Sequence, residues 1–114
     1  LRGFARKATG RTEPVKLGEA FEASLLLHAS RLRSDMVRVI APPIPPDLAV
    51  MGDRIRLEQI LVNILQNAQD ALADRRDPQI VVTLRQTAET VTLSIADNGP
   101  GQGATFHLDL RRAP

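Results

Sequence analysis

The chain has 114 residues, of which 43% are hydrophobic and 25% are charged, values that fit one small globular domain and argue against disorder. Cysteine is absent, which excludes disulfides and thiolate metal sites, and a net charge of +2 with only three aromatic residues, all Phe, argues against a nucleic-acid-binding surface. No apolar run approaches the roughly 20 residues that a membrane-spanning helix needs.

The first half of the chain is predicted to contain one helix and two short strands. The helix is favoured by four side chains that recur at helical spacing and would form one stripe: Phe21, Leu25, His28 and Leu32. Four prolines between the two strands exclude regular structure there. In chain order we expect the end of a helix at 1–8, a linker at 9–14, the helix at 17–35, and strands at 36–41 and 48–51.

The second half is predicted to contain a long helix, with Asp53 as its N-cap, followed by three strands. The helix is indicated by apolar residues at helical spacing: Leu57, Ile60, Leu61, Ile64, Leu65, Ala68, Ala71 and Leu72. In chain order we expect the helix at 53–74, strands at 79–85, 91–97 and 103–111, and a hairpin connection at 86–90. Two helices can cover only one face of such a sheet, so the order of elements predicts an α+β two-layer sandwich with a mostly antiparallel sheet.

The long helix also carries a polar face opposite its apolar stripe. Its members are Gln59, Asn63, Gln66, Asn67, Asp70 and Asp74. Asn is a weak helix former, and the amides of Asn63 and Asn67 would lie side by side, one turn apart. Their carbonyl oxygens could bind a hard cation or its waters, and their NH₂ groups could donate to phosphate. Taken alone, this face is explained at least as well by contact with solvent.

A second group of polar and small residues ends the strand at 91–97. Strand alternation points Asp97 toward the buried side, where a carboxylate needs a partner. Gly99 and Gly101 follow it, and glycine lets a backbone turn sharply and approach a ligand closely. A simple turn would show the same residues, so this motif taken alone decides nothing.

Together the two motifs are more specific than either one. NxxxN on a helix with a following Asp, then a hairpin, then Asp97-Asn98-Gly99-Pro100-Gly101, resembles the N box and the first glycine box of histidine kinases. Residues 56–72 are similar to that family nearly letter for letter, and residues 103–108 resemble its closing GATF strand. Residues 1–7 resemble the end of the dimerisation helix in the C4-dicarboxylate-sensing branch of the family.

The resemblance implies a Bergerat α/β sandwich, with a mixed, mostly antiparallel sheet and helices on one face. It divides the chain into 1–14, the tail of the dimerisation helix and a linker, and 15–114, the ATP-binding catalytic domain. The family continues after the position of Gly101 with several dozen residues that hold the ATP lid and a second glycine box. Here only Gln102 separates Gly101 from Gly103, so the domain is incomplete. Two explanations are open: a mobile lid that this sequence omits, or a real internal deletion, which would leave weak or no ATP binding and no kinase activity.

The resemblance also implies a role for each matching residue. Asn67 would ligate the Mg²⁺ that bridges the phosphates of ATP, and Asn63 would support that metal or its waters. Asp70 would face the phosphate region. Asp97 would accept a hydrogen bond from the adenine amine, with Thr105 close by, and the two loop glycines would let the backbone pass the nucleotide.

By this resemblance the chain is the ATP-binding domain of a two-component sensor histidine kinase, which presents Mg-ATP to a histidine on a separate dimerisation domain. ATP-hydrolysing relatives carry a general-base Glu where this chain has Asn63, and an amide cannot take a proton from water. The phosphoacceptor is not expected in this chain. His28 lies in an apolar stripe, and neither His28 nor His107 has the acidic neighbour that follows an acceptor.

Other parts of the implied system lie outside this chain. The resemblance implies a response regulator as a partner and a homodimeric full-length protein in the bacterial inner membrane, with this domain on the cytoplasmic side. Two alternatives stay open. The first is a degenerate, non-catalytic signalling scaffold, which the missing lid favours and which intact Asn63, Asn67 and Asp97 argue against. The second is an ATP-driven clamp of the mismatch-repair or chaperone type, which Asn63 in place of Glu argues against.

Overall fold

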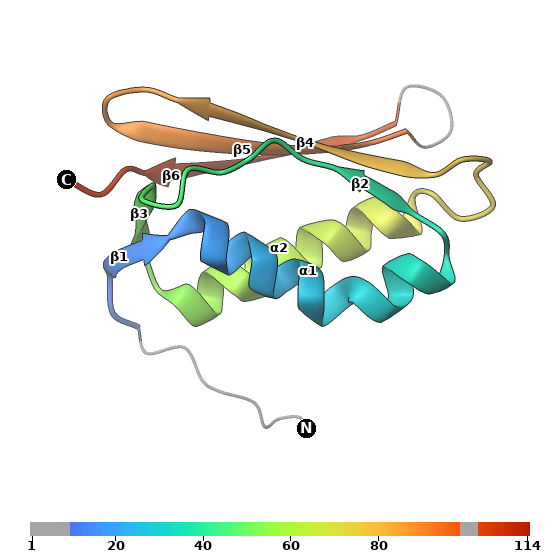
Figure 1. Ribbon diagram of the computed structural model, residues 1–114, viewed down its shortest axis with the longest axis horizontal. Helices are drawn as coiled ribbons and strands as arrows, with labels where there is room; N and C mark the ends of the chain where they lie inside the picture. Colours follow the sequence, from blue (N-terminus) through green and yellow to red (C-terminus); the bar gives the residue numbers. More distant parts are fainter. Residues whose placement is uncertain (1–9, 99–102) are drawn as a thin grey trace.

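The computed structural model describes residues 10–98 and 103–114 as a two-layer α+β sandwich. The sheet forms one layer and the two helices form the other (Figure 1). Predictions for residues 1–8, Gly99 and Gly101 lie outside the described residues. The elements in chain order are β1 (Glu13–Lys16), α1 (Leu17–Ser34), β2 (Arg38–Ile40), β3 (Ala49–Gly52), α2 (Arg54–Asp70), β4 (Gln79–Gln86), β5 (Thr90–Asp97) and β6 (Thr105–Arg111).

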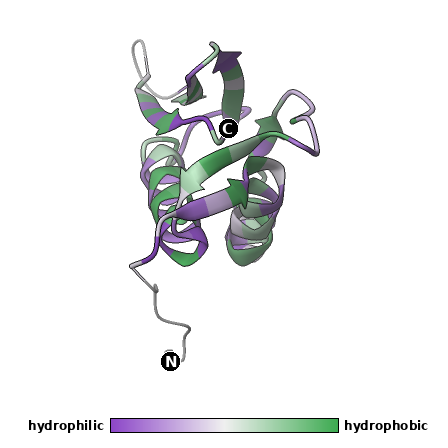
Figure 2. Cartoon of the chain, turned by 90° about the vertical axis from the view of Figure 1, so that its left-hand side faces the viewer, coloured by the Kyte–Doolittle hydropathy of each residue, from purple (hydrophilic) through white to green (hydrophobic). Residues whose placement is uncertain are grey.

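The main sheet has four strands in the order β2-β4-β5-β6. β2 runs parallel to β4, because a crossover through β3 and α2 connects them, whereas the other two pairs are antiparallel. β1 and β3 form a separate antiparallel pair that leads directly into the first turns of α1 and α2. The two helices lie side by side beneath the sheet (Figure 2). The predicted sandwich, with a mixed and mostly antiparallel sheet and helices on one face, is therefore confirmed.

The core between the layers is built from aliphatic side chains. Leu61 and Leu65 of α2 and Leu93 and Ile95 of β5 are fully buried. Each such side chain contributes about 1.5–3 kcal/mol relative to an exposed position. The helical and the alternating apolar patterns of the sequence thus meet in one core. Neither helix in the described part of the chain has the length and hydrophobicity that a membrane span requires.

Strand β1 is the element that the sequence pattern does not predict. Residues 13–14, assigned to a linker because of nearby Gly10 and Pro14, begin this strand. Among the described strands β1 pairs with β3 alone, and proline is tolerated mainly on such edge strands because it cannot donate to a ladder. Val15 is 4% exposed, so the strand also contributes to the core.

The long helix ends at Asp70, four residues before its predicted end at 74. The chain then tightens into turns, in which the N–H of Leu72 donates to the carbonyl of Gln69, three residues back. Asp74 lies in these turns with a φ of 63° and not on the polar face of the helix. The prediction for Asp74 is therefore wrong, because helical spacing continues in the sequence beyond the last helical residue.

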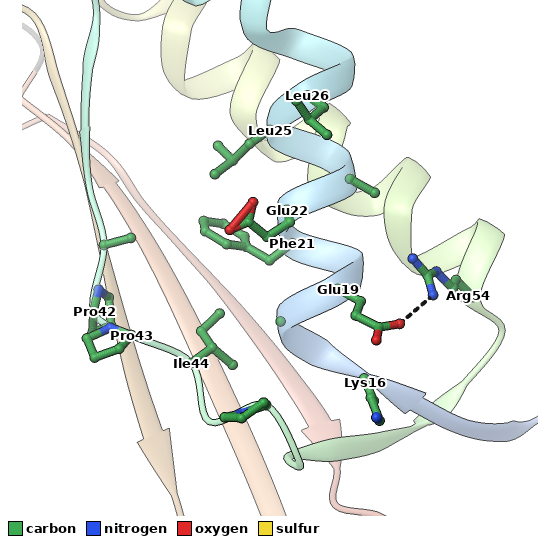
Figure 3. Close-up of a pocket in the computed structure, with 14 residues that line it drawn as sticks. Lys16, Glu19, Phe21, Glu22, Leu25, Leu26, Pro42, Pro43, Ile44 and Arg54 are labelled. Carbon is green, nitrogen blue, oxygen red and sulfur yellow. Dashed lines mark hydrogen bonds and ion pairs between the residues drawn. The ribbon is translucent and has the colours of Figure 1, made fainter.

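Ion pairs tie the first turns of α1 and α2 together. The guanidinium of Arg54 lies 2.9 Å from the carboxylates of both Glu19 and Glu58, and Figure 3 shows the contact with Glu19. Glu58 is buried, and its hydrogen bond raises the pKa of Arg54 above its usual value. A mostly apolar hollow between α1 and the proline-rich segment 42–46 lies beside this contact (Figure 3). None of the residues that the two sequence motifs singled out lines it.

Asp53 caps α2 as predicted, and its replacement by Ala is expected to lower the free energy of unfolding by about 1 kcal/mol. Its Oδ1 accepts the N–H groups of Ile55 and Arg56 at 3.0 and 3.2 Å, and its Oδ2 accepts the N–H of Gly10 at 2.8 Å. Urea unfolding followed by circular dichroism would measure the loss. Asp53→Asn keeps an oxygen at the cap and should lose less. Equal losses in the two variants would contradict the capping role.

Candidate functional site

The polar face of α2 is exposed along the part of the helix that carries the NxxxN motif. Asn63 and Asn67 are both exposed and lie one turn apart on the helix. The opposite side packs Leu61 and Leu65 into the core. The amide groups of the two Asn residues therefore lie on the solvent side of a rigid element, where a cation or phosphate could reach them.

Asp70, in the last turn of α2, is engaged by the neighbouring helix. Its Oδ1 accepts a hydrogen bond from Nη2 of Arg31 in α1 at 2.6 Å. The same guanidinium lies 3.9 Å from the carboxylate of Asp35, the C-cap residue of α1. Sequence reasoning missed Arg31, because no local pattern links two residues that are 39 positions apart.

Asp97 is buried at the end of β5, as strand alternation predicts. Its side chain is on the same side as the fully buried Leu93 and Ile95, and the residue is 6% exposed. The main-chain N–H of Asp97 donates to the carbonyl of Ala104 at 3.0 Å, and its Oδ1 accepts the N–H of Ala104 at 3.3 Å. A carboxylate is therefore held in one orientation at the rim of the core.

Two further residues fix the end of β5, and sequence reasoning assigned a role to neither. Asn98 accepts the N–H of Gln79 at 2.8 Å and donates to the carbonyl of Asp77 at 3.1 Å, which joins this strand end to the start of β4. Gly103 has a φ of +71°, and a Cβ there would stand 2.2 Å from the main-chain oxygen of Asp97. Only glycine fits that position, so Gly103 packs closely against the end of β5.

Thr105 is not brought together with Asp97. The register pairs Thr105 with Ala96, and directly opposite residues share a face of the sheet, so Thr105 lies on the face opposite to Asp97. Thr105 is exposed, whereas the next residue, Phe106, is half-buried on the inner face.

Each of the two histidines is hydrogen-bonded to a neighbouring side chain. His28 is 7% exposed and its Nε2 is hydrogen-bonded to Oε1 of Gln69, which confirms it as a packed residue. His107 is exposed on β6 and its Nδ1 lies 2.8 Å from the hydroxyl of Ser94.

The ends of α2 and β5 carry Asp70 and Asp97, whereas Asn63 lies near the middle of α2. The end of α2 and the end of β5 lie at the same side of Figure 1, and the hydrogen bonds of Asn98 join β5 to the segment that follows α2. The described residues contain no group of three or more His, Cys, Asp or Glu side chains able to hold a metal ion. A cation at this end would therefore depend on amide oxygens such as those of Asn63 and Asn67. Amide oxygens suit a hard cation such as Mg²⁺, so the donor set fits.

Residues 52–111 match the family described as histidine kinase-, DNA gyrase B-, and HSP90-like ATPase. The chain is 42% identical over 112 residues to the C4-dicarboxylate transport sensor protein DctB of Rhizobium meliloti (strain 1021), covering 96% of this chain and 18% of that protein. It is 42% identical over 104 residues to the phosphoglycerate transport system sensor protein PgtB of Salmonella typhimurium. That match covers 89% of this chain and 15% of PgtB. The chain thus spans less than a fifth of the length of these relatives.

Solved structures share the architecture. The nucleotide-free catalytic domain of histidine kinase ThkA superposes with a TM-score of 0.70 at 26% identity, over 79% of this chain and 60% of that one. The mycobacterial sensor histidine kinase MprB gives a TM-score of 0.60 at 32% identity, over 79% of this chain and 57% of the MprB chain. The chain belongs to the histidine kinase-, DNA gyrase B- and HSP90-like ATPase family and has the fold of a histidine kinase catalytic domain.

Proposed function

We propose that this chain is the ATP-binding catalytic domain of a two-component sensor histidine kinase, which presents Mg-ATP to a histidine on a dimerisation domain of the same protein. The observation that carries the proposal is the buried carboxylate of Asp97 at the end of β5, beside a helix whose exposed face carries Asn63 and Asn67. Family membership and the similarity to sensor proteins support the same conclusion.

Adenine recognition is assigned to Asp97. A buried carboxylate is a strong acceptor for an N–H donor, and the exocyclic amine of adenine is such a donor. The N–H of Ala104 already holds Oδ1, so the carboxylate cannot rotate freely. Gly99 and Gly101, which follow in the sequence, would let the loop backbone pass close to the nucleotide, and Thr105 would contribute through a water at most, because it lies on the other face.

Phosphate and metal binding is assigned to the exposed face of α2. Asn67 would hold Mg²⁺ through its amide oxygen, and Asn63 would hold the metal or its waters one turn earlier. Bound Mg²⁺ supplies positive charge that neutralises the phosphates during transfer. Asn63 cannot act as a general base, so the site would keep ATP for an external nucleophile instead of hydrolysing it.

The other components of the proposed kinase system are the dimerisation domain, the response regulator and the membrane. We assign the residues before β1 to the tail of the dimerisation helix and a linker, and β1 with all that follows to the ATP-binding domain, which moves the expected boundary at residue 14 to the start of β1 at Glu13. The acceptor histidine would come from the dimerisation domain of a homodimer, and a response regulator would receive the phosphoryl group. ThkA has been solved in complex with the response regulator TrrA, which supports a partner of that class. The full-length protein would lie in the bacterial inner membrane, with this domain in the cytoplasm.

The short β5–β6 connection sets the expected affinity. Residues 96 and 105 are already paired in the sheet, and the N–H of Asp97 bonds to the carbonyl of Ala104. The family has several dozen residues at this point, so we expect the few residues of this chain to leave the phosphates of a nucleotide uncovered. We expect this chain to bind ATP with a Kd weaker than about 100 μM, which corresponds to roughly 5.5 kcal/mol of binding free energy.

A titration with ATP, followed by two-dimensional NMR with and without Mg²⁺, tests the proposal. Shifts should appear at the ends of α2 and β5, and Mg²⁺ should strengthen binding. Asn67→Ala should remove the Mg²⁺ effect, a loss of about tenfold, whereas Gln59→Ala on the same exposed face should not. Phosphorylation of an added dimerisation domain would then show catalysis. No shift at millimolar ATP would overturn the nucleotide site and favour the non-catalytic scaffold.

A further inference from the structure

An ion pair from α1 reaches the face of α2 that carries the two Asn residues. Nη2 of Arg31 donates to Oδ1 of Asp70 at 2.6 Å, and the two side chains are 45% and 54% exposed. Asp70 follows Asn67 by three positions, so the two side chains are neighbours on the helix surface. The guanidinium of Arg31 is thus bonded to a side chain that neighbours the amide we assign to the metal.

The position of Arg31 is fixed by a second set of contacts. Gln69, which is 2% exposed, donates from its Nε2 to the main-chain carbonyl of Arg31 at 3.0 Å and to the carboxylate of Asp35. Its Oε1 is then the acceptor for His28, whose Nε2 carries the hydrogen. These bonds lock the last turns of α1 against the last turn of α2. The main chain that carries Arg31 therefore lies at a fixed place beside the last turn of α2, within reach of Asp70.

The ion pair contributes little to stability. Pairs that are about half exposed are worth about 0–1 kcal/mol, because water and salt screen the charges. The ion pair matters more for the binding of a charged ligand than for the stability of the fold. A carboxylate beside Asn67 would repel the phosphates of ATP, and the repulsion acts on several negative charges at once. A guanidinium bonded to that carboxylate offsets its charge beside Asn67, and it lies closer to Asp70 than to Asp35, at 2.6 against 3.9 Å.

We propose that Arg31 is a charge-compensating residue of the nucleotide site, which pairs with Asp70 so that the phosphates of ATP can approach Asn67. This inference rests on the function proposed above. It gives α1 a part in nucleotide binding, although Arg31 need not touch the nucleotide. Arg31 acts through Asp70 and is a positioning residue in this sense, not a catalytic one.

Four variants test the inference: Arg31→Met, Arg31→Lys, Asp70→Asn and the double variant Arg31→Met with Asp70→Asn. The affinities for Mg-ATP and for uncharged adenosine are measured by NMR titration at low salt. Arg31→Met should weaken Mg-ATP binding about three- to tenfold and leave adenosine binding unchanged. Arg31→Lys keeps the charge and should retain most of the affinity. The double variant should return to the wild-type affinity, because it lacks both charges.

Arg38→Met is the matched control, because Arg38 forms a similarly exposed ion pair with Asp77 at 3.5 Å. It should leave both affinities unchanged. Equal Mg-ATP affinity for wild type and Arg31→Met would overturn the role of Arg31 but not the proposed function. A loss of Mg-ATP binding in Asp70→Asn would also overturn it, since Asp70 would then serve the metal directly. If the wild-type chain binds neither ligand, the proposed function falls, and the role of Arg31 falls with it.

Discussion

Asp97→Asn is expected to weaken adenosine nucleotide binding about 10- to 100-fold while the fold stays intact. A hydrogen bond to a charged group is worth about 1.5–3 kcal/mol, and each 1.4 kcal/mol is a factor of ten in affinity. In the variant, the Asn oxygen would keep the bond from the N–H of Ala104, as Oδ1 of Asp97 does now. The NH₂ group would then face the amine of adenine, so that two donors meet and neither has an acceptor.

The same geometry predicts a change of base preference. Inosine nucleotides carry a carbonyl oxygen where adenine carries its amine, and the Asn NH₂ group could donate to that oxygen. Asp97→Asn should therefore bind an inosine nucleotide better than an adenosine nucleotide, whereas the wild type should show the reverse order. NMR titrations at millimolar concentrations with both nucleotides measure the two preferences.

Asp109→Asn is the control for the loss of one negative charge. Asp109 is exposed on β6, on the outer face of the sheet, where it accepts a hydrogen bond from Thr92 at 2.7 Å. It should bind both nucleotides as the wild type does. If Asp97→Asn bound adenosine nucleotides as tightly as wild type, Asp97 would not read the base, and its burial would need a purely structural explanation.

The sequence predicts most of the fold because both helices and the three long strands carry strong apolar periods. Alternation alone also places Asp97 on the buried side, since Leu93 and Ile95 precede it at spacing two. The same alternation places Thr105 on the face opposite to Asp97, because its neighbour Phe106 lies on the inner face. The expectation that Thr105 lies near Asp97 came from the resemblance and not from this pattern.

The contacts that the sequence does not predict are those between distant segments. β1 is short and contains Pro14, so its pairing with β3 outweighs a weak local preference. The bond between Arg31 and Asp70 depends on how two helices pack, and many exposed charges on those helices could have formed it equally well. Asn is common in turns, so the sequence gives Asn98 no special role. Only the structure shows that its side chain joins the end of β5 to the start of β4.

Gly103→Ala is expected to lower the free energy of unfolding by at least about 2 kcal/mol. Two costs add at this position. A φ of +71° is unfavourable for any residue with a Cβ, and the new Cβ would stand 2.2 Å from the main-chain oxygen of Asp97. Backbone cannot move aside as a flexible side chain would, so the β5–β6 connection must shift. Urea unfolding measures the loss.

Two other glycines separate these costs. Gly10 has a φ of +75° with open space around its Cβ position, so Gly10→Ala should show the conformational cost alone, about 1 kcal/mol. Gly52 has neither a positive φ nor a neighbour within 4 Å, so Gly52→Ala should change stability little. A Gly103→Ala variant no less stable than Gly10→Ala would show that the contact with Asp97 adds nothing.

The clash at Gly103 also reaches the proposed nucleotide site. The atom that the new Cβ meets belongs to Asp97, whose carboxylate we assign to adenine. Displacement of that strand end should weaken adenosine binding in Gly103→Ala, even at temperatures where the variant is fully folded. Gly10→Ala should leave binding unchanged, because Gly10 contacts the N-cap of α2 and not β5. If Gly103→Ala lost stability but kept its adenosine affinity, the position of Asp97 would not depend on this turn, and the adenine site would tolerate more movement than the close packing implies.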